Sequence, residues 1–359
     1  EGIVGEVLGL VQASYPWSPA LGPNIADNLT GVFWFAFALF AMTTASILSG
    51  AVIERIKVGA YAILAVVLGS FTWVVAAAWG WNPYGWFLTE FGYHDFGCSA
   101  VLHGVAGFFA LGVLINLGPR IGKFDANGRA RTIMPHNLPL TMVGQMLNLV
   151  GFYAILAACD IFVPGQTAEI TIYGTPMTLA SVGVNTTLAL CSGIVGSYIS
   201  SKGEPFYTIS GGLAGIISVG AGLDLYSPAI IILIAFIGAY TQPIVGAFAG
   251  HGFCGVIGAM AVGVTASGYA QGDGIPLTGI VGQFVGTFVC TVILGFIPGY
   301  GVSFVLKKLG MLRVSPEEEI SGLDLSEYGV KGYPEYPLVE ESGVNGVRSP
   351  VAPAQEMTA

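Results

Sequence analysis

The sequence predicts an all-α membrane protein, a polytopic helical bundle with one large membrane domain. Of its 359 residues, 54% are hydrophobic and 9% are charged, whereas an average soluble domain carries about a quarter charged residues. Runs of about 20 apolar residues recur along the chain, and each is long enough to cross a ~30 Å hydrocarbon core. The 53 glycines are expected at helix contacts, because small residues let helix axes approach closely in lipid.

Nine apolar segments are expected to form the membrane spans. They cover residues 29–53, 58–80, 98–118, 138–158, 178–200, 206–223, 227–243, 249–268 and 276–306. The seventh is short and is bracketed by Pro228 and Pro243. An odd number of spans places the two termini on opposite sides of the membrane.

The twelve lysines and arginines support this count. With nine spans, all of them fall in loops on one side of the membrane or in the C-terminal tail. The loops on the other side, which contain none, cover residues 81–97, 159–177, 224–226 and 269–275. Because cytoplasmic loops are the Lys/Arg-rich ones, we expect the C-terminus inside the cell and the N-terminus outside.

The chain therefore divides into three expected parts. Residues 1–28 form an extracellular N-terminal segment, residues 29–312 the transmembrane domain, and residues 313–359 a cytoplasmic tail. The tail changes character at once, since "SPEEEISGLDLSEYGVKGY" is acidic and its last stretch has the composition of a disordered segment. The chain begins with "EGIVGEVLGL" and no Met, so we interpret its start as a truncation point.

One short pattern, His-Gly-x-x-Gly, occurs once in each half of the chain. His103 lies in "LHGVAG" of the third span and His251 lies in "GHGFCG" of the eighth. An odd number of helix steps separates these two spans, so they run antiparallel, as in the inverted-topology repeats of transporters. The glycines one and four residues after each histidine are expected to leave space beside its ring.

Two interpretations of the histidines remain open. Each ring could be a packing residue bonded to a backbone carbonyl, but ionisable residues inside a membrane usually face a cavity or pathway. Burial disfavours the imidazolium form, and two neutral rings can share an N–H···N hydrogen bond. We therefore expect His103 and His251 to meet near the midplane, where they can bind a small polar molecule and relay a proton.

The longer motifs resemble a known family. "FAMTTASILSGAVIERIKVGAY", "DFGCSAVLHGVAG", "LGPRIG", "HNLPL" and "GHGFCGVIGAMAVG" closely resemble successive signatures of the ammonium transporter (Amt/Mep/Rh) family. "EEEISGLDLSEYGVKGY" resembles its cytoplasmic tail. The resemblance covers residues 30–335 in family order. It implies an inverted-repeat fold with eleven spans, a homotrimer, and one pore in each subunit.

The resemblance also implies roles for individual residues. His103 and His251 are similar to the twin histidines that line the family's hydrophobic lumen. Asp95 resembles the aspartate near the ammonium recruitment site, and Trp79 the vestibule tryptophan, whose ring face can hold a cation. Phe40 occupies the position of one phenylalanine of the aromatic gate.

The chain also departs from the family pattern. Where members continue with a stretch like "GWFGFNAGS", this chain reads "GFYAILAAC", so the second gate phenylalanine is Ile155 and the vestibule serine is Cys159. Ile155 is expected to loosen the gate, and Cys159, a weaker hydrogen-bond partner than a hydroxyl, to weaken recruitment. The chain begins at what resembles the third family span, which favours a fragment over a natural nine-span protein.

Other residues have plainer interpretations. Asp95 can be an N-cap that opens the third span, with a contribution to the charge of the pore. Trp81 and Trp86 are interpreted as an interfacial aromatic belt, His94 as an exposed loop residue, and the five cysteines as small packing residues. No metal site or cofactor is expected.

The function predicted is ammonium transport across the plasma membrane. NH4+ is recruited and deprotonated at an outer vestibule, and NH3 passes the twin histidines. The alternative is an ammonium sensor with little or no transport; an enzyme is not expected, because no nucleophile–base constellation accompanies the histidines. The resemblance implies ammonium, a homotrimer and a PII-type regulator at the tail as partners, and no nucleic acid.

Overall fold

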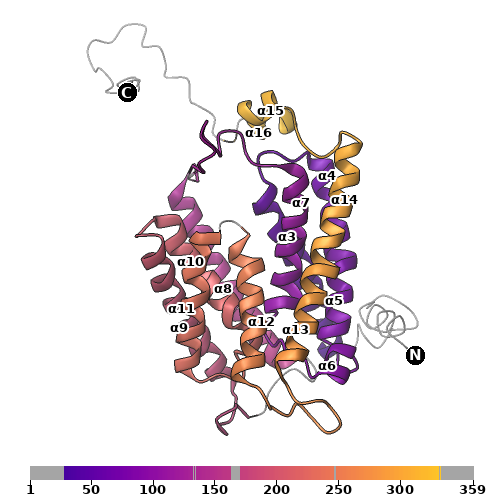
Figure 1. Cartoon of the computed structure of the whole chain (residues 1–359), viewed down its shortest axis with the longest axis vertical. Coiled ribbons are helices and arrows are strands. Elements are labelled where there is room, and N and C mark those ends of the chain that lie inside the picture. The colour runs from indigo at the N-terminus through magenta and orange to yellow at the C-terminus, as the bar shows by residue number, and fades with distance from the viewer. Residues whose placement is uncertain are drawn as a thin grey trace.

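The helices of the chain stand side by side and run nearly parallel or antiparallel to one another (Figure 1). The structure, a computed structural model, describes residues 28–330 and 332, apart from residues 132, 134, 163–169 and 246–247. The expected extracellular segment, residues 1–28, lies outside the described residues except for Asn28. In the described part of the chain, the only β-structure consists of three isolated bridges.

Helices cover all nine apolar segments expected from the sequence, and a further short helix, α6, lies in the expected loop 81–97. Those of the first half are α3 (Asn28–Val52), α4 (Val58–Val67) with η2 (Leu68–Thr72) and α5 (Trp73–Gly80), α6 (Trp86–Phe91), η3 (Ser99–Gly104) with α7 (Val105–Leu117), and α8 (Leu138–Phe162). Those of the second half are α9 (Leu179–Ser200), α10 (Pro205–Val219) with η4 (Gly220–Gly222), α11 (Pro228–Val245), η5 (Ala249–Phe253) with α12 (Cys254–Thr265), and α13 (Ile280–Phe288) with η6 (Val289–Phe296) and α14 (Ile297–Lys308). Two short helices, α15 (Pro316–Ser321) and α16 (Leu323–Tyr328), follow.

Six helical stretches of the described chain are long and apolar enough to cross a membrane. They cover Phe35–Val52, Val58–Gly80, Ser99–Leu117, Leu138–Asp160, Leu179–Ser200 and Ile280–Lys308. Two further apolar helices, Pro228–Ile244 and Gly250–Thr265, are shorter. The all-helical membrane fold is therefore confirmed, whereas the count of nine spans stays a prediction.

Side chains at the helix starts explain where several helices begin. Thr178 and Ser181 form a reciprocal capping box at α9, and Ser315 and Glu318 do the same at α15. The Glu204 carboxylate accepts the backbone N–H groups of the first turn of α10. These polar groups satisfy N–H donors that a helix start leaves without intrahelical partners.

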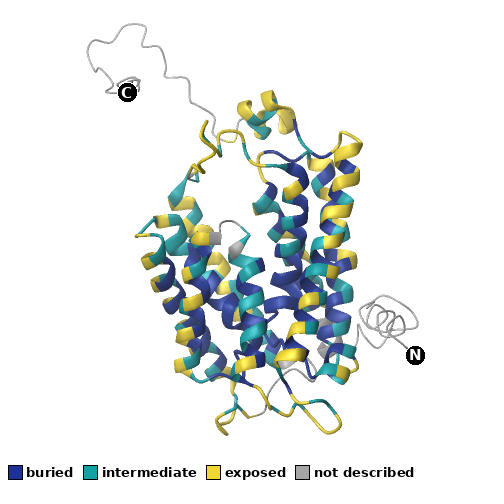
Figure 2. Cartoon of the chain, in the orientation of Figure 1, coloured by how far each residue is buried: buried dark blue, intermediate teal, exposed yellow. Residues whose placement is uncertain are grey.

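Buried residues lie inside the bundle and exposed residues lie on its outer faces (Figure 2). Many of the exposed residues are large and apolar. On α8, for example, Met146, Leu147 and Val150 are exposed to about two thirds or more of their area. A soluble monomer rarely exposes a contiguous apolar surface of this kind. Lipid or another subunit must therefore cover it.

The two His-Gly-x-x-Gly segments cross each other through their glycines. A methyl group added at Gly107 would overlap the backbone of Gly252, and one added at Gly255 would overlap the backbone of Gly104 and of Ser99. The last glycine of each motif thus packs against the first glycine of the other. The sequence pattern predicted space beside each ring, but the glycines chiefly allow the two helix backbones to touch.

The loops that contain lysine and arginine meet at one end of the bundle, called the basic end here. The Arg55 guanidinium is buried and donates to the carbonyl oxygens of Ala51, Ile53 and Gly118. Burial, and secondarily the charges of Arg120 and Arg313, lowers the pKa of Arg55 to about 10. Arg55 therefore stays charged at neutral pH while it ties the loop after α3 to the loop after α7.

The start of the acidic tail is fixed to the same end. Arg313 donates to the carbonyl oxygens of Leu117 and Pro119 and forms an ion pair with Glu319 at 2.7 Å. Glu319 also accepts the backbone N–H of Ile121. The tail up to α15 is therefore held against the loop that follows α7, and its boundary at residue 313 stays a prediction.

The glycine crossing can be tested with Gly255→Ala. The added methyl group would push against the backbone of Ser99 and Gly104, and overpacking of this kind costs about 1–3 kcal/mol. We expect a lower apparent melting temperature in detergent and a wider separation of the two histidine rings. Gly301→Ala is the matched control, since nothing lies within 4 Å of a methyl group there. Equal melting temperatures for the two variants would contradict the crossing.

Candidate functional site

Both histidines lie in π-helical turns at the start of their spans. His103 belongs to η3 and His251 to η5. In η3, the backbone N–H of His103 bonds to the carbonyl oxygen of Cys98, five residues earlier, and Cys98 itself has a left-handed φ of 61°. Such wide turns occur mostly as short insertions in α-helices, often at functional sites. The same local device thus places one histidine in each half of the repeat.

The structure brings the two rings together. Nδ1 of His103 lies 3.0 Å from Nδ1 of His251, and the ring centroids are 5.1 Å apart with an interplanar angle of 25°. Phe152 of α8 stacks on His103 at 5.9 Å. A hydrogen bond between two imidazole nitrogens needs one donor and one acceptor, so at least one Nδ1 carries no proton. Each Nδ1 therefore has the other ring, not a backbone carbonyl, as its partner.

Asp95 caps the N-terminus of η3. Its fully buried carboxylate accepts the backbone N–H groups of Ser99, Ala100 and Val101 at 2.7–2.9 Å and the Tyr93 hydroxyl at 3.2 Å. Burial raises the pKa of Asp95, and the three backbone N–H bonds oppose this shift. The contacts of Asp95 are thus those of a helix cap, as the sequence indicated. The Asp95 carboxylate could act on a cation only through its negative charge.

Phe40 and Trp81 belong to one buried aromatic cluster. The Phe40 ring meets the Trp81 ring edge-on at 5.0 Å and stacks on Trp73 at 6.4 Å. The prediction that Trp81 belongs to an interfacial belt is wrong, because only 1% of Trp81 is exposed. Its indole N–H donates to the backbone oxygen of Asp95 at 2.6 Å, and this contact draws the ring into the core beside the cap.

The ring of Trp79 contacts other aromatic rings than those of that cluster. It is half-buried at the end of α5 and packs edge-on against Trp86 at 5.7 Å and Phe87 at 6.1 Å. Its buried indole N–H has no hydrogen-bond partner among the described residues. The buried indole N–H groups of Trp73 and Trp86 are in the same situation.

Ile155 and Cys159 lie one helical turn apart on α8. Cys159 is fully buried, and Ile155 is half-buried against the core. The Cys159 thiol lies within electrostatic reach of the carboxylates of Asp95, Asp160 and Asp224. The structure thus gathers Cys159 and Asp95 in one region.

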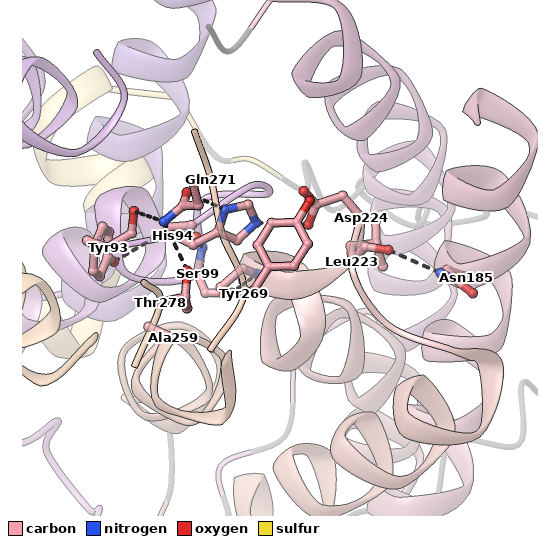
Figure 3. A network of polar contacts seen from close by, with 12 residues as sticks. Tyr93, His94, Ser99, Asn185, Leu223, Asp224, Ala259, Tyr269, Gln271 and Thr278 are labelled. Carbon is pink, nitrogen blue, oxygen red and sulfur yellow. Dashed lines mark hydrogen bonds and ion pairs between the residues drawn. The ribbon is translucent and has the colours of Figure 1, made fainter. Parts of the chain in front are cut away.

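The prediction that His94 is an exposed loop residue is wrong. The residue is 1% exposed, and its ring lies 3.0 Å from a carboxylate oxygen of Asp224 and 3.0 Å from the amide oxygen of Gln271 (Figure 3). These partners stand 130 and 177 residues away along the chain. The available signal was Asp224 itself, a carboxylate that interrupts an apolar stretch and requires a partner when buried.

The remaining candidates add no metal site. In the described part of the chain, no group of three or more His, Cys, Asp or Glu side chains is placed to hold a metal ion. Four cysteines are buried and Cys191 is exposed, and none forms a disulfide. Burial of the four agrees with the interpretation of cysteines as packing residues.

An all-helical apolar bundle in which two antiparallel helices meet at a polar pair is typical of membrane transport proteins. The chain belongs to the Ammonium Transporter Family, whose sequence profile matches residues 20–333. It is 32% identical over 345 residues to Ammonium transporter Amt2 of Methanocaldococcus jannaschii, covering 90% of this chain and 76% of that protein. The resemblance stated from the motifs is therefore confirmed.

Solved structures agree with this assignment. The "Sensor Amt Protein" aligns with a TM-score of 0.67 and 26% identity, covering 80% of this chain and 74% of its own. The Rh50 protein of Nitrosomonas europaea aligns with a TM-score of 0.59 and 22% identity, covering 83% and 81%; at that identity it supports the fold alone.

The cap at Asp95 can be tested with Asp95→Asn. The amide would turn one N–H group toward the backbone donors of η3, and hydrogen bonds to a charged group contribute about 1.5–3 kcal/mol each. We expect a clear drop in the apparent melting temperature of the purified protein. Glu90→Gln, an exposed carboxylate in α6, is the control and should change little. An unchanged melting temperature for Asp95→Asn would rule out the cap as a stabilising contact.

Proposed function

We propose that this chain conducts ammonium by deprotonating NH4+ at an outer vestibule and passing NH3 along the His103–His251 pair. The observation that carries the proposal is the 3.0 Å contact between the two Nδ1 atoms at the crossing of the inverted helices. Family membership supports transport.

The chemistry of the pair suits a neutral cargo. A bare cation in an apolar passage is far more costly than a neutral molecule, so NH4+ has to lose its proton before it enters. Two linked imidazoles offer one donor and one acceptor to a small polar molecule. They can also relay a proton, because each neutral ring has one unprotonated nitrogen that can take up a proton and one N–H that can release it.

Recruitment is proposed for Trp79, Asp95 and Cys159. Trp79 contributes a half-buried ring face, which can hold a cation, and the carboxylate of Asp95 adds negative charge near the Cys159 thiol. Phe40 and Ile155 are proposed as the gate. Phe40 is packed against Trp73 and Trp81, whereas Ile155 offers no ring to stack on it, and we therefore expect a loose gate.

A second candidate is an ammonium sensor. It is favoured by the similarity to the solved "Sensor Amt Protein" and by the replacement of gate and vestibule residues with Ile155 and Cys159. A sensor would bind ammonium at the same vestibule with little flux. Measured uptake by the purified chain separates the two candidates.

We further propose a homotrimer in the plasma membrane, with the N-terminus outside and the basic end of the bundle in the cytoplasm. The exposed apolar helix faces support coverage by lipid and by neighbouring subunits, and the lysines and arginines support the orientation. The tail that begins at Arg313 is proposed as the contact for a PII-type regulator. Its first residues are held at the basic end, because Arg313 donates to the carbonyl oxygen of Pro119 and Glu319 accepts the backbone N–H of Ile121.

The experiment compares His103→Ala, His251→Ala and the double variant in proteoliposomes. Ammonium uptake and the accompanying current are both measured, since loss of the ring pair should lower uptake or change the charge carried per ammonium. We expect at least a tenfold change in either the uptake rate or the current. A tenfold change in rate corresponds to about 1.4 kcal/mol in the height of the activation barrier.

His136→Ala is the matched control, because this exposed histidine lies just before α8, far from the pair in sequence. It should retain wild-type uptake and current. If the double variant also retained both, the proposed mechanism would fail. Binding of ammonium with no uptake by the wild-type chain would favour the sensor.

A further inference from the structure

His94 joins three segments that are distant in sequence, one of which is its own. Its own segment leads from α6 to η3, Asp224 belongs to the connection between α10 and α11, and Gln271 belongs to the connection between α12 and α13 (Figure 3). These connections meet at the end of the bundle opposite the basic end. The backbone of His94 is also fixed, because the Gln283 amide accepts its N–H at 2.7 Å and donates to its carbonyl at 2.8 Å.

The hydrogen bonds of Gln271 determine which way its amide points. Its Nε2 lies 2.8 Å from the carbonyl oxygen of Gly92, 3.3 Å from that of Tyr93 and 3.0 Å from the Thr278 hydroxyl. The two carbonyl oxygens can only accept, so Nε2 must face them and Oε1 must face His94. This assignment rests on the surrounding acceptors and not on a visible proton.

Both ring nitrogens of His94 therefore face an oxygen acceptor. Nδ1 lies 3.0 Å from Gln271 Oε1 and Nε2 lies 3.0 Å from Asp224 Oδ1. A neutral imidazole has only one N–H, so its other nitrogen, an acceptor, would face an oxygen that is also an acceptor. An imidazolium donates to both oxygens. The site fits the charged form of His94.

The charges around the ring agree with this assignment. Burial alone lowers the pKa of His94, but the charge and hydrogen bond of Asp224, the hydrogen bond of Gln271 and the charge of Asp95 together raise it above its usual value. The other titratable groups on the three segments are Tyr93, Tyr226, Tyr269, the buried Cys98 thiol and the exposed Asp273 carboxylate, and Asp160 of α8 interacts electrostatically with Asp224. Asp224 and His94 are both almost completely buried.

We propose that His94 is a positioning residue of the outer ammonium site: as an imidazolium between Asp224 and Gln271, it clamps the three connections together and holds the neighbouring Asp95 in place. The proposal rests on the proposed function for its link to ammonium. The clamp itself stands on the contacts of His94. Asp95 follows His94 directly, so the contacts that anchor the His94 ring help to hold the Asp95 carboxylate in register on η3, together with Trp81, which binds the Asp95 backbone oxygen.

The clamp gives the protein an alkaline limit. Because the folded pKa of His94 is raised, its stabilisation is fully present below the unfolded pKa and is lost as the pH rises through the folded pKa. Deprotonation would leave an oxygen of Asp224 or Gln271 facing a ring nitrogen that no longer donates. We expect the connections to loosen and the outer site to lose affinity at alkaline external pH.

The experiment uses the full chain and three variants, His94→Gln, Asp224→Asn and the double variant. Apparent melting temperature is followed against pH in detergent. The apparent KM and maximal rate of uptake are followed in proteoliposomes, with the NH4+ concentration, not total ammonium, held fixed as the external pH changes. Asp273→Asn, an exposed carboxylate in the same connection as Gln271, is the matched control.

In the wild type, both melting temperature and affinity should fall as the pH rises through the titration of His94. Asp224→Asn should move this fall to lower pH, because the proton on His94 loses its counter-charge. His94→Gln should abolish the pH step and raise KM on the order of tenfold with a smaller change in maximal rate, as removal of one partner leaves a buried charge. The double variant should recover part of the loss, because no uncompensated carboxylate remains.

Two results would overturn the proposal. If Asp224→Asn kept the wild-type pH dependence of melting, the clamp would be wrong. If the pH step in melting moved as expected but KM did not follow it, His94 would stabilise the fold without positioning Asp95. Failure of the proposed function would look different. If the variants of His103 and His251 kept wild-type uptake, the proposed function would fail, but the pH step in melting temperature would be unchanged.

Discussion

The contact between the two His-Gly-x-x-Gly segments is the constraint on which the rest of the structure depends. Gly107 lies against Gly252, and Gly255 lies against Gly104, so no side chain separates the two helix backbones. Only at this separation can two imidazole rings from opposite directions share a hydrogen bond. The glycines therefore set the distance between the helices, and the histidines use it.

Polar groups near the ends of the crossing spans keep it in register. Asp95 fixes the start of η3 by accepting three consecutive N–H groups, and Trp81 anchors the backbone of Asp95 in turn. At the basic end, Arg55 and Arg313 bind the carbonyl groups that end α7. Each of these contacts replaces water at a buried backbone group, where an unsatisfied partner would be costly. The apolar spans between the ends can then pack with few polar requirements of their own.

Much of this arrangement could be predicted from the sequence because its signals are local. Apolar runs of membrane length mark the helices, and the repeated five-residue pattern indicates which two spans run antiparallel and carry the histidines. The contacts of His94 and Trp81 could not be predicted in this way. Both residues resemble surface positions by sequence, and each is buried by a partner that only the tertiary fold supplies: Asp224 and Gln271 for His94, and the backbone of Asp95 for Trp81.

In the pair of histidine rings, one Nδ1 donates a hydrogen bond and the other accepts it. Nitrogen-15 NMR of histidine-labelled protein in bilayers at pH 7 reads this directly, with His103 and His251 assigned from the single variants. We expect one protonated and one unprotonated Nδ1, joined by a correlation between the two rings. Two imidazolium signals, or two rings without a correlation, would contradict this hydrogen bond.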